Sequence, residues 1–172
     1  ANGSAGPNGV KKIVLVGCGL IGKYIADCAD NRNFASVDSV YDQDPGAARS
    51  VPGARVLETP DQVAASDADL VVEAATAQAV RDIAPGVLTR NDMLIFSVTS
   101  LADDDFRETL RQTCKKHGTR LYIPHGAILG LDGISDGREV LEEVTITTTK
   151  HPRNLGLTEP AAGTLYEGST RG

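Results

Sequence analysis

Six short apolar segments alternate with segments of helical spacing, and this alternation constrains the fold more than any other feature of the chain. The predicted strands cover residues 11–16, 37–41, 54–57, 70–75, 93–97 and 120–123. Short apolar strands separated by helices are typical of a doubly wound parallel sheet with right-handed crossovers. The sequence therefore predicts an α/β domain over residues 11–124.

The predicted helices begin at recognisable capping residues. These N-caps are Asp44 before Pro45, Thr59 with Gln62, Thr76, and Ser100 with Asp103. Ser, Thr and Asp accept hydrogen bonds from the free N–H groups of a first helical turn. The last helix ends near Gly118, beside His117, which the helix dipole favours as a cation.

The character of the chain changes after Pro124. Glycines interrupt the following stretch, and residues 144–149 alternate apolar and polar side chains, which predicts a half-exposed strand. We expect a flexible tail over residues 1–10, one domain over 11–124, and part of a second α/β domain over 125–172. A segment of fewer than about 50 residues is too short to bury a good hydrophobic core unaided. We therefore expect this second domain to be incomplete.

Composition excludes several classes of protein. The chain has 172 residues and a net charge of −6, which argues against nucleic acid and anionic membranes as partners. No apolar run is long enough to span a bilayer. The three cysteines form no C-x-x-C pair, which favours reduced thiols in a cytoplasmic protein and no metal site.

A glycine-rich loop joins the first predicted strand to the first helix. Residues 17–22 read G-C-G-L-I-G. Gly17 allows a tight turn, Gly19 allows the backbone to approach a pyrophosphate, and Gly22 allows the helix to pack on the strand. Leu20 and Ile21 open the helix, whose free N–H groups favour an anion. The loop in this context predicts a Rossmann-type dinucleotide site.

An acidic residue stands where such a site needs one. Asp42 lies 20 residues after Gly22, at the end of the second strand, where a carboxylate accepts ribose hydroxyls. Because Asp44 is the better helix cap, Asp42 is expected to be free for the ribose. The acidic run 42–44 would repel a 2′-phosphate, so we expect NAD rather than NADP, although NADP stays possible.

Two further loops follow predicted strands at the same edge of the sheet. Residues 73–76 (E-A-A-T) and 97–100 (S-V-T-S) are mostly small. Loops at the carboxyl ends of strands line the ligand crevice of an open α/β sheet. Ala75 and Thr99 are therefore expected to contact the cofactor.

The chain resembles the archaeal-type L-aspartate dehydrogenases. The matching stretches are residues 16–22, 72–75, 78–80, 97–103, 122–132, 144–150 and 167–169. The most specific is the I-P-x-G-A-I-x-G-L-D run that begins at Ile123. Two stretches depart from the family pattern: position 125 is His where the family usually has Ser, and residues 97–100 are S-V-T-S where the family often has Ser-x-Gly-Ala.

The resemblance implies an NAD(P) enzyme that oxidises the CH–NH2 group of L-aspartate to iminoaspartate, which yields oxaloacetate, and that can feed NAD biosynthesis. It implies that Ala127 contacts the cofactor, and that a second domain forms the substrate pocket and a homodimer interface. The family's catalytic His and an Asn beside nicotinamide have no counterpart up to Gly172. We therefore expect a C-terminally truncated chain that binds NAD without turning over aspartate.

His125 is the histidine placed best for chemistry, because it follows the sixth strand beside the expected cofactor crevice. A proton-transfer or substrate role and an ordinary loop histidine both fit the sequence. Two other functions stay open for the chain. One is a non-catalytic NAD-binding module, and the other is a reductase of the homoserine-dehydrogenase or dihydrodipicolinate-reductase type.

Overall fold

The computed structural model describes residues 10–32, 35–125 and 130–149. Its contacts divide the chain into two compact units, 1–129 and 130–172. The expected tail over residues 1–10 lies almost wholly outside the described part. The strands of the first unit are β1 (Lys11–Val16), β2 (Ala35–Tyr41), β3 (Arg55–Val56), β4 (Leu70–Glu73), β5 (Met93–Ile95) and β6 (Leu121–Tyr122).

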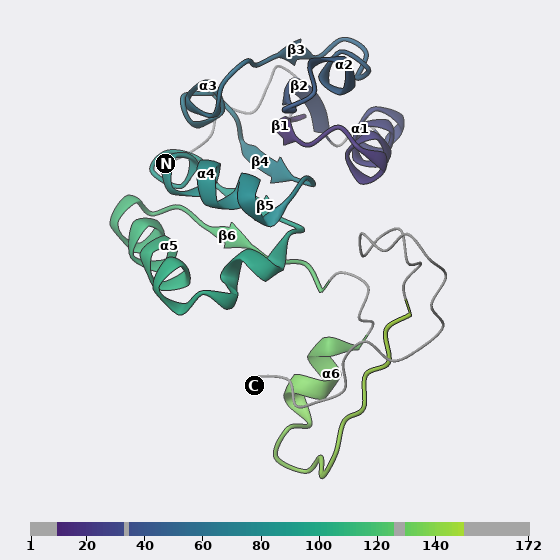
Figure 1. Ribbon diagram of the computed structural model, residues 1–172, viewed down its shortest axis with the longest axis vertical. Helices are drawn as coiled ribbons and strands as arrows, with labels where there is room; N and C mark the ends of the chain where they lie inside the picture. Colours follow the sequence, from purple (N-terminus) through teal and green to yellow (C-terminus); the bar gives the residue numbers. More distant parts are fainter. Residues whose placement is uncertain (1–9, 33–34, 126–129, 150–172) are drawn as a thin grey trace, which may run out of the picture. The chain divides into compact units, whose positions relative to one another are not determined.

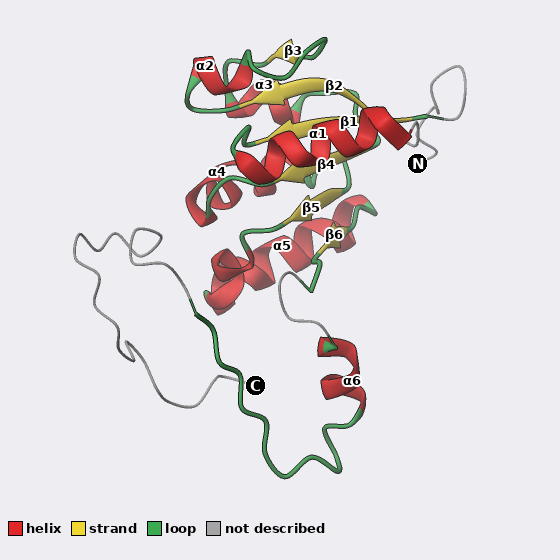
Figure 2. Ribbon diagram, turned by 90° about the vertical axis from the view of Figure 1, so that its right-hand side faces the viewer, coloured by secondary structure: helices red, strands yellow, loops and turns green. Residues whose placement is uncertain are grey.

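All six strands form one parallel sheet in the order β3-β2-β1-β4-β5-β6. Figures 1 and 2 show the strands in this order from top to bottom. The chain leaves β3 at one edge and returns to the middle at β4, so the winding direction reverses between β1 and β4. This confirms the predicted doubly wound α/β fold and places its switch point, where such sheets bind ligands, between β1 and β4.

Helices cover both faces of the sheet. They are α1 (Leu20–Arg32), α2 (Pro45–Ala48), α3 (Pro60–Ala64), α4 (Ala77–Val87), the 3₁₀ helix η1 (Val98–Ala102) and α5 (Asp104–His117). One apolar cluster joins the sheet to α1 and α2, and a second joins it to α3, α4 and α5. The sheet is therefore the middle of three layers.

Strand β1 shows why the core forms here. Ile13 and Leu15 belong to the cluster under α1, whereas Val14 and Val16 belong to the cluster under α4. All four are at most 6% exposed. Burial of each such side chain contributes about 1.5–3 kcal/mol, so a continuous apolar run is the pattern that a central parallel strand requires.

Three of the four predicted helix starts are confirmed. The side chains of Asp44, Thr59 and Thr76 accept backbone N–H bonds at the starts of α2, α3 and α4. The prediction for Ser100 is wrong: Asp103 caps α5 by accepting from the N–H of Phe106. Ser100 instead lies in η1 and donates to the carbonyl of Ser97, because a 3₁₀ turn separates β5 from α5.

The predicted strand over residues 144–149 is also wrong. The described part of the second unit, residues 130–149, contains the helix α6 (Leu131–Asp136) and no strand. A β-strand needs a neighbour for its backbone hydrogen bonds, and residues 130–149 offer none. The alternating pattern leaves Val144 and Ile146 exposed.

Candidate functional site

The phosphate-binding loop begins with a turn that only glycine adopts readily. Gly17 has a φ of 92°, and its N–H donates to the carbonyl of Tyr41 at 2.8 Å. A Cβ on Gly17 would lie 2.7 Å from the carbonyl oxygen of Ala74 and 2.7 Å from Cβ of Ala75. The loop therefore packs directly against the segment that follows β4.

The loop then opens toward solvent at the start of α1. A Cβ on Gly19 would meet nothing within 4 Å. The following side chains, Leu20 and Ile21, are 89% and 52% exposed. The first N–H groups of a helix have no intrahelical partner. At this exposed end of α1 they are therefore available to donate to a pyrophosphate.

Gly22 holds the helix against the sheet. A Cβ at this position would collide with the carbonyl oxygen of Gly17, because α1 begins directly behind the loop. The close packing of the helix that the sequence predicts for Gly22 therefore follows from this contact alone.

We expect Gly22→Val to destabilise the fold. Forcing a side chain into a packed contact costs about 1–3 kcal/mol, which corresponds to a fall in melting temperature of roughly 3–10 °C for a chain of this size. Thermal unfolding followed by circular dichroism measures the shift. An unchanged melting temperature would show that the loop and α1 can separate freely.

Asp42 directly follows β2, and it binds the loop as well as lining the pocket. One carboxylate oxygen accepts the N–H of Cys18 at 2.7 Å, and the other accepts the N–H of Asp44 at 2.8 Å. Asp44 is the helix cap, as expected, but Asp42 is not without partners, since each of its carboxylate oxygens already accepts one backbone N–H. Each carboxylate oxygen can accept a second hydrogen bond, so capacity for ribose hydroxyls remains.

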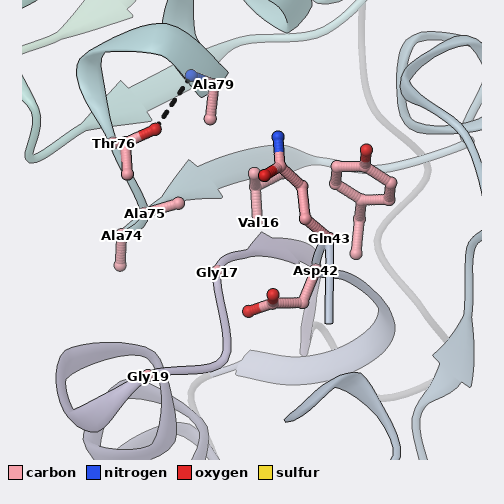
Figure 3. Close-up of a pocket in the computed structure, with 10 residues that line it drawn as sticks. Val16, Gly17, Gly19, Asp42, Gln43, Ala74, Ala75, Thr76 and Ala79 are labelled. Carbon is pink, nitrogen blue, oxygen red and sulfur yellow. Dashed lines mark hydrogen bonds between the residues drawn. The ribbon is translucent and has the colours of Figure 1, made fainter. Parts of the chain in front are cut away.

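A pocket of about 250 Å³ lies between the loop, the end of β2 and the start of α4. Figure 3 shows Gly17 and Gly19 on one side, Asp42 and Gln43 beside them, and Ala74, Ala75, Thr76 and Ala79 opposite. The dashed bond in Figure 3 joins the hydroxyl of Thr76 to the N–H of Ala79. No Lys or Arg is among the described residues that line this pocket.

These residues fit a dinucleotide. Open space over Gly19 leaves room for the pyrophosphate beside the N-terminus of α1. Asp42 stands at the pocket wall with acceptor capacity for a ribose. The small side chains of Ala74 and Ala75 leave the opposite wall shallow.

Cys18 takes no part in this chemistry as a nucleophile. Burial of the thiol, followed by the nearby Asp42 carboxylate, raises the pKa of Cys18 to about 11. A neutral buried thiol is unreactive at ordinary pH. All three cysteines are free in the structure, so Cys18 acts as a small apolar side chain under the loop.

The structure reveals one charged side chain that the sequence analysis did not select. Glu73 ends β4 with 0% exposure, and its carboxylate accepts from the N–H of Ala75 and from both the N–H and the hydroxyl of Ser97. An acid at the end of the apolar run L-V-V-E was the signal that could have identified it. Glu73 joins the loops that follow β4 and β5.

The predicted site residues do not all meet in one place. The pocket brings together Gly17, Gly19, Asp42 and Ala75. The other described candidates do not line it: Leu20, Ile21, Gly22, Thr99 and His125. Thr99 lies exposed in η1, and Ala127 lies outside the described residues.

His125 lies three residues beyond the end of β6, where its side chain is exposed. It therefore shares the carboxyl edge of the sheet with the loops after β4 and β5. In the part of the chain that the structure describes, no group of three or more His, Cys, Asp or Glu side chains could hold a metal ion. That part also contains no helix of the length and apolarity that a membrane crossing requires.

The sheet order and this pocket define a Rossmann-type dinucleotide-binding domain. The family model "Homoserine dehydrogenase, NAD binding domain" matches residues 17–124. The chain belongs to this family of NAD-binding domains.

The predicted resemblance to archaeal L-aspartate dehydrogenases is confirmed. The chain is 38% identical to the L-aspartate dehydrogenase of Nitrosopumilus maritimus over 85% of this chain and 56% of the relative. It is 40% identical to the L-aspartate dehydrogenase of Methanocaldococcus jannaschii over 81% of this chain and 55% of the relative. The chain thus spans little more than half the length of these relatives.

A solved structure agrees with the sequence relatives. The aspartate dehydrogenase of Thermotoga maritima superposes with a TM-score of 0.65 at 29% identity, over 92% of this chain and 64% of that chain. The similarity therefore extends beyond the nucleotide-binding sheet that the family model covers.

Proposed function

We propose that the protein carrying this chain is an NAD-dependent oxidoreductase that acts on the CH–NH2 group of L-aspartate. The observation that supports this substrate is the similarity to L-aspartate dehydrogenases over more than four fifths of the chain. In the proposed reaction the Cα–H of aspartate leaves as a hydride and the amine loses a proton, which gives iminoaspartate. NAD⁺ supplies the hydride acceptor when it is bound.

The pocket supports NAD over NADP. Asp42 lies where the adenosine ribose is expected, Asp44 adds a second negative charge nearby, and the described lining contains no cation. A 2′-phosphate would meet this charge without a compensating partner. In this proposal the three glycines shape the loop, namely Gly17, Gly19 and Gly22. Leu20 and Ile21 flank the loop. The remaining proposed cofactor contacts are Ala75, Thr99 and Ala127.

His125 is the proposed proton-transfer residue among the described side chains. It lies beyond β6, on the carboxyl edge of the sheet, where the loops after β4 and β5 also lie. A positioned base contributes about 10²- to 10⁴-fold to a rate. An imidazole at this edge would take the amine proton of a substrate held there.

We further propose a cytoplasmic homodimer that acts on a small molecule, without a metal ion, nucleic acid or membrane as partner, and that can feed NAD biosynthesis. The free cysteines and the net charge of −6 support this assignment. Light scattering of the purified protein tests the dimer directly, since a monomeric mass would contradict it.

The substrate is tested by a panel. The protein carrying this chain is mixed with NAD⁺ at alkaline pH and with L-aspartate or L-homoserine, and NADH formation is followed. We expect aspartate to be oxidised faster than homoserine. Faster oxidation of homoserine would support the second candidate function, a homoserine-dehydrogenase-type reaction. The description of the matching family favours that candidate. NAD binding with no turnover of either would support a non-catalytic module.

A further inference from the structure

Glu73 is an ionisable side chain in a place where burial is costly. It ends an otherwise apolar strand and has no exposed surface. Its Oε1 accepts the N–H of Ala75 at 2.7 Å and the hydroxyl of Ser97 at 2.7 Å, and its Oε2 accepts the N–H of Ser97 at 3.0 Å. A buried carboxylate persists when such donors satisfy it.

These bonds join two different loops at the carboxyl edge of the sheet. Ala75 belongs to the loop between β4 and α4, where it lines the pocket and lies against Gly17. Ser97 lies 24 residues after Glu73, between β5 and η1. Without Glu73, no side chain in the described hydrogen-bond network would connect the backbones of these two loops directly.

The two loops would face different parts of a dinucleotide bound at this site. Asp42, directly after β2, marks the adenosine side of the switch point. The remaining half of a dinucleotide extends across the switch point toward β4 and β5. Because Ala75 lies against Gly17 of the phosphate loop, the Ala75 loop borders the diphosphate, and the Ser97 loop, which lies one strand further from β1, is on the side of the nicotinamide.

We propose that Glu73 is a positioning residue for the dinucleotide, and that through Ser97 it sets the loop on the nicotinamide side. This inference rests on the proposed NAD function. Glu73 itself touches no ligand, because its carboxylate is buried beneath both loops. It acts through Ala75 on one side and through Ser97 on the other.

Two substitutions separate these connections. Ser97→Ala removes the hydroxyl bond to Glu73 and keeps both backbone bonds. Glu73→Gln keeps the shape but replaces one acceptor oxygen by a donor NH2, so in either orientation a backbone N–H of Ala75 or Ser97 faces another donor.

The matched control is Asn91→Ala. Asn91 is 8% exposed, and its amide donates to the carbonyl of Ser66 at 3.1 Å. It precedes β5 and thus lies at the opposite, amino end of the strands. Its loss lowers stability without touching either loop.

The experiment measures calorimetric affinity for NAD⁺ and for ADP, together with the melting temperature and the amide hydrogen exchange of Ala75 and Ser97. We expect Ser97→Ala to lower the affinity for NAD⁺ about fivefold and to leave the affinity for ADP unchanged. We expect Glu73→Gln to weaken both about tenfold and to speed exchange at Ala75 or Ser97. Asn91→Ala should change only the melting temperature.

The inference is overturned if Ser97→Ala affects ADP as much as NAD⁺, or affects neither. It is also overturned if Glu73→Gln and Asn91→Ala reduce affinity equally at equal loss of stability, since Glu73 would then be structural only. Absence of NAD⁺ binding by the unmodified chain is a different result, which contradicts the proposed function itself.

Discussion

Gly19→Val is expected to abolish NAD binding while leaving the fold intact. The new side chain would occupy the space through which the pyrophosphate approaches the backbone. An affinity loss of at least about 100-fold is expected, which corresponds to ~2.7 kcal/mol. Since a Cβ at Gly19 meets nothing within 4 Å and its φ is not positive, the unliganded chain accommodates the substitution.

Gly133→Val is the matched control for this experiment. Gly133 also has open space around its Cβ and no positive φ, but it lies in α6 of the second unit. Calorimetry should show normal NAD affinity for this variant and none for Gly19→Val, with intact thermal unfolding in both. Unchanged affinity in Gly19→Val would remove the phosphate-binding role from the loop.

Substitution of Asp42 is expected to have the second largest effect. Asp42→Ala removes the acceptor proposed for the ribose hydroxyls and also frees the N–H of Cys18, which it now holds. Hydrogen bonds to a charged group contribute about 1.5–3 kcal/mol, so we expect NAD affinity to fall roughly 10- to 100-fold. Asp42→Arg should shift preference toward NADP, because a cation would replace the carboxylate beside a 2′-phosphate.

Asp44→Ala provides the comparison for Asp42. Asp44 is exposed and caps the short helix α2 by accepting the N–H of Gly46 at 2.8 Å. Its removal should cost about 1 kcal/mol of stability and change NAD affinity little. If Asp44→Ala and Asp42→Ala lower NAD affinity equally, the general negative charge of the segment matters rather than a ribose contact at Asp42.

Local patterns predicted the parts of the fold that local physics controls. The continuous apolar run of β1 identified a strand covered on both faces. The capping side chains of Thr59 and Thr76 marked helix starts, because each bonds a backbone N–H three residues away. The glycine loop was recognisable because Gly17 must adopt a positive φ.

Sequence patterns failed where the outcome depends on distant residues. The alternation over residues 144–149 carries no information about whether a neighbouring strand exists. The partners of Glu73 include Ser97, which lies 24 residues away and comes close only when β4 pairs with β5. In the same way, the bond from Asp42 to the N–H of Cys18 depends on the pairing of β1 with β2.

The most direct test of this account is a calorimetric titration of the unmodified chain with NAD⁺ and, separately, with NADP⁺. We expect NAD⁺ to bind at a single site per chain and more tightly than NADP⁺, because Asp42 and the lack of a cation among the described lining residues favour a free ribose over a 2′-phosphate. Equal or tighter binding of NADP⁺, or no binding of NAD⁺ at all, would contradict it.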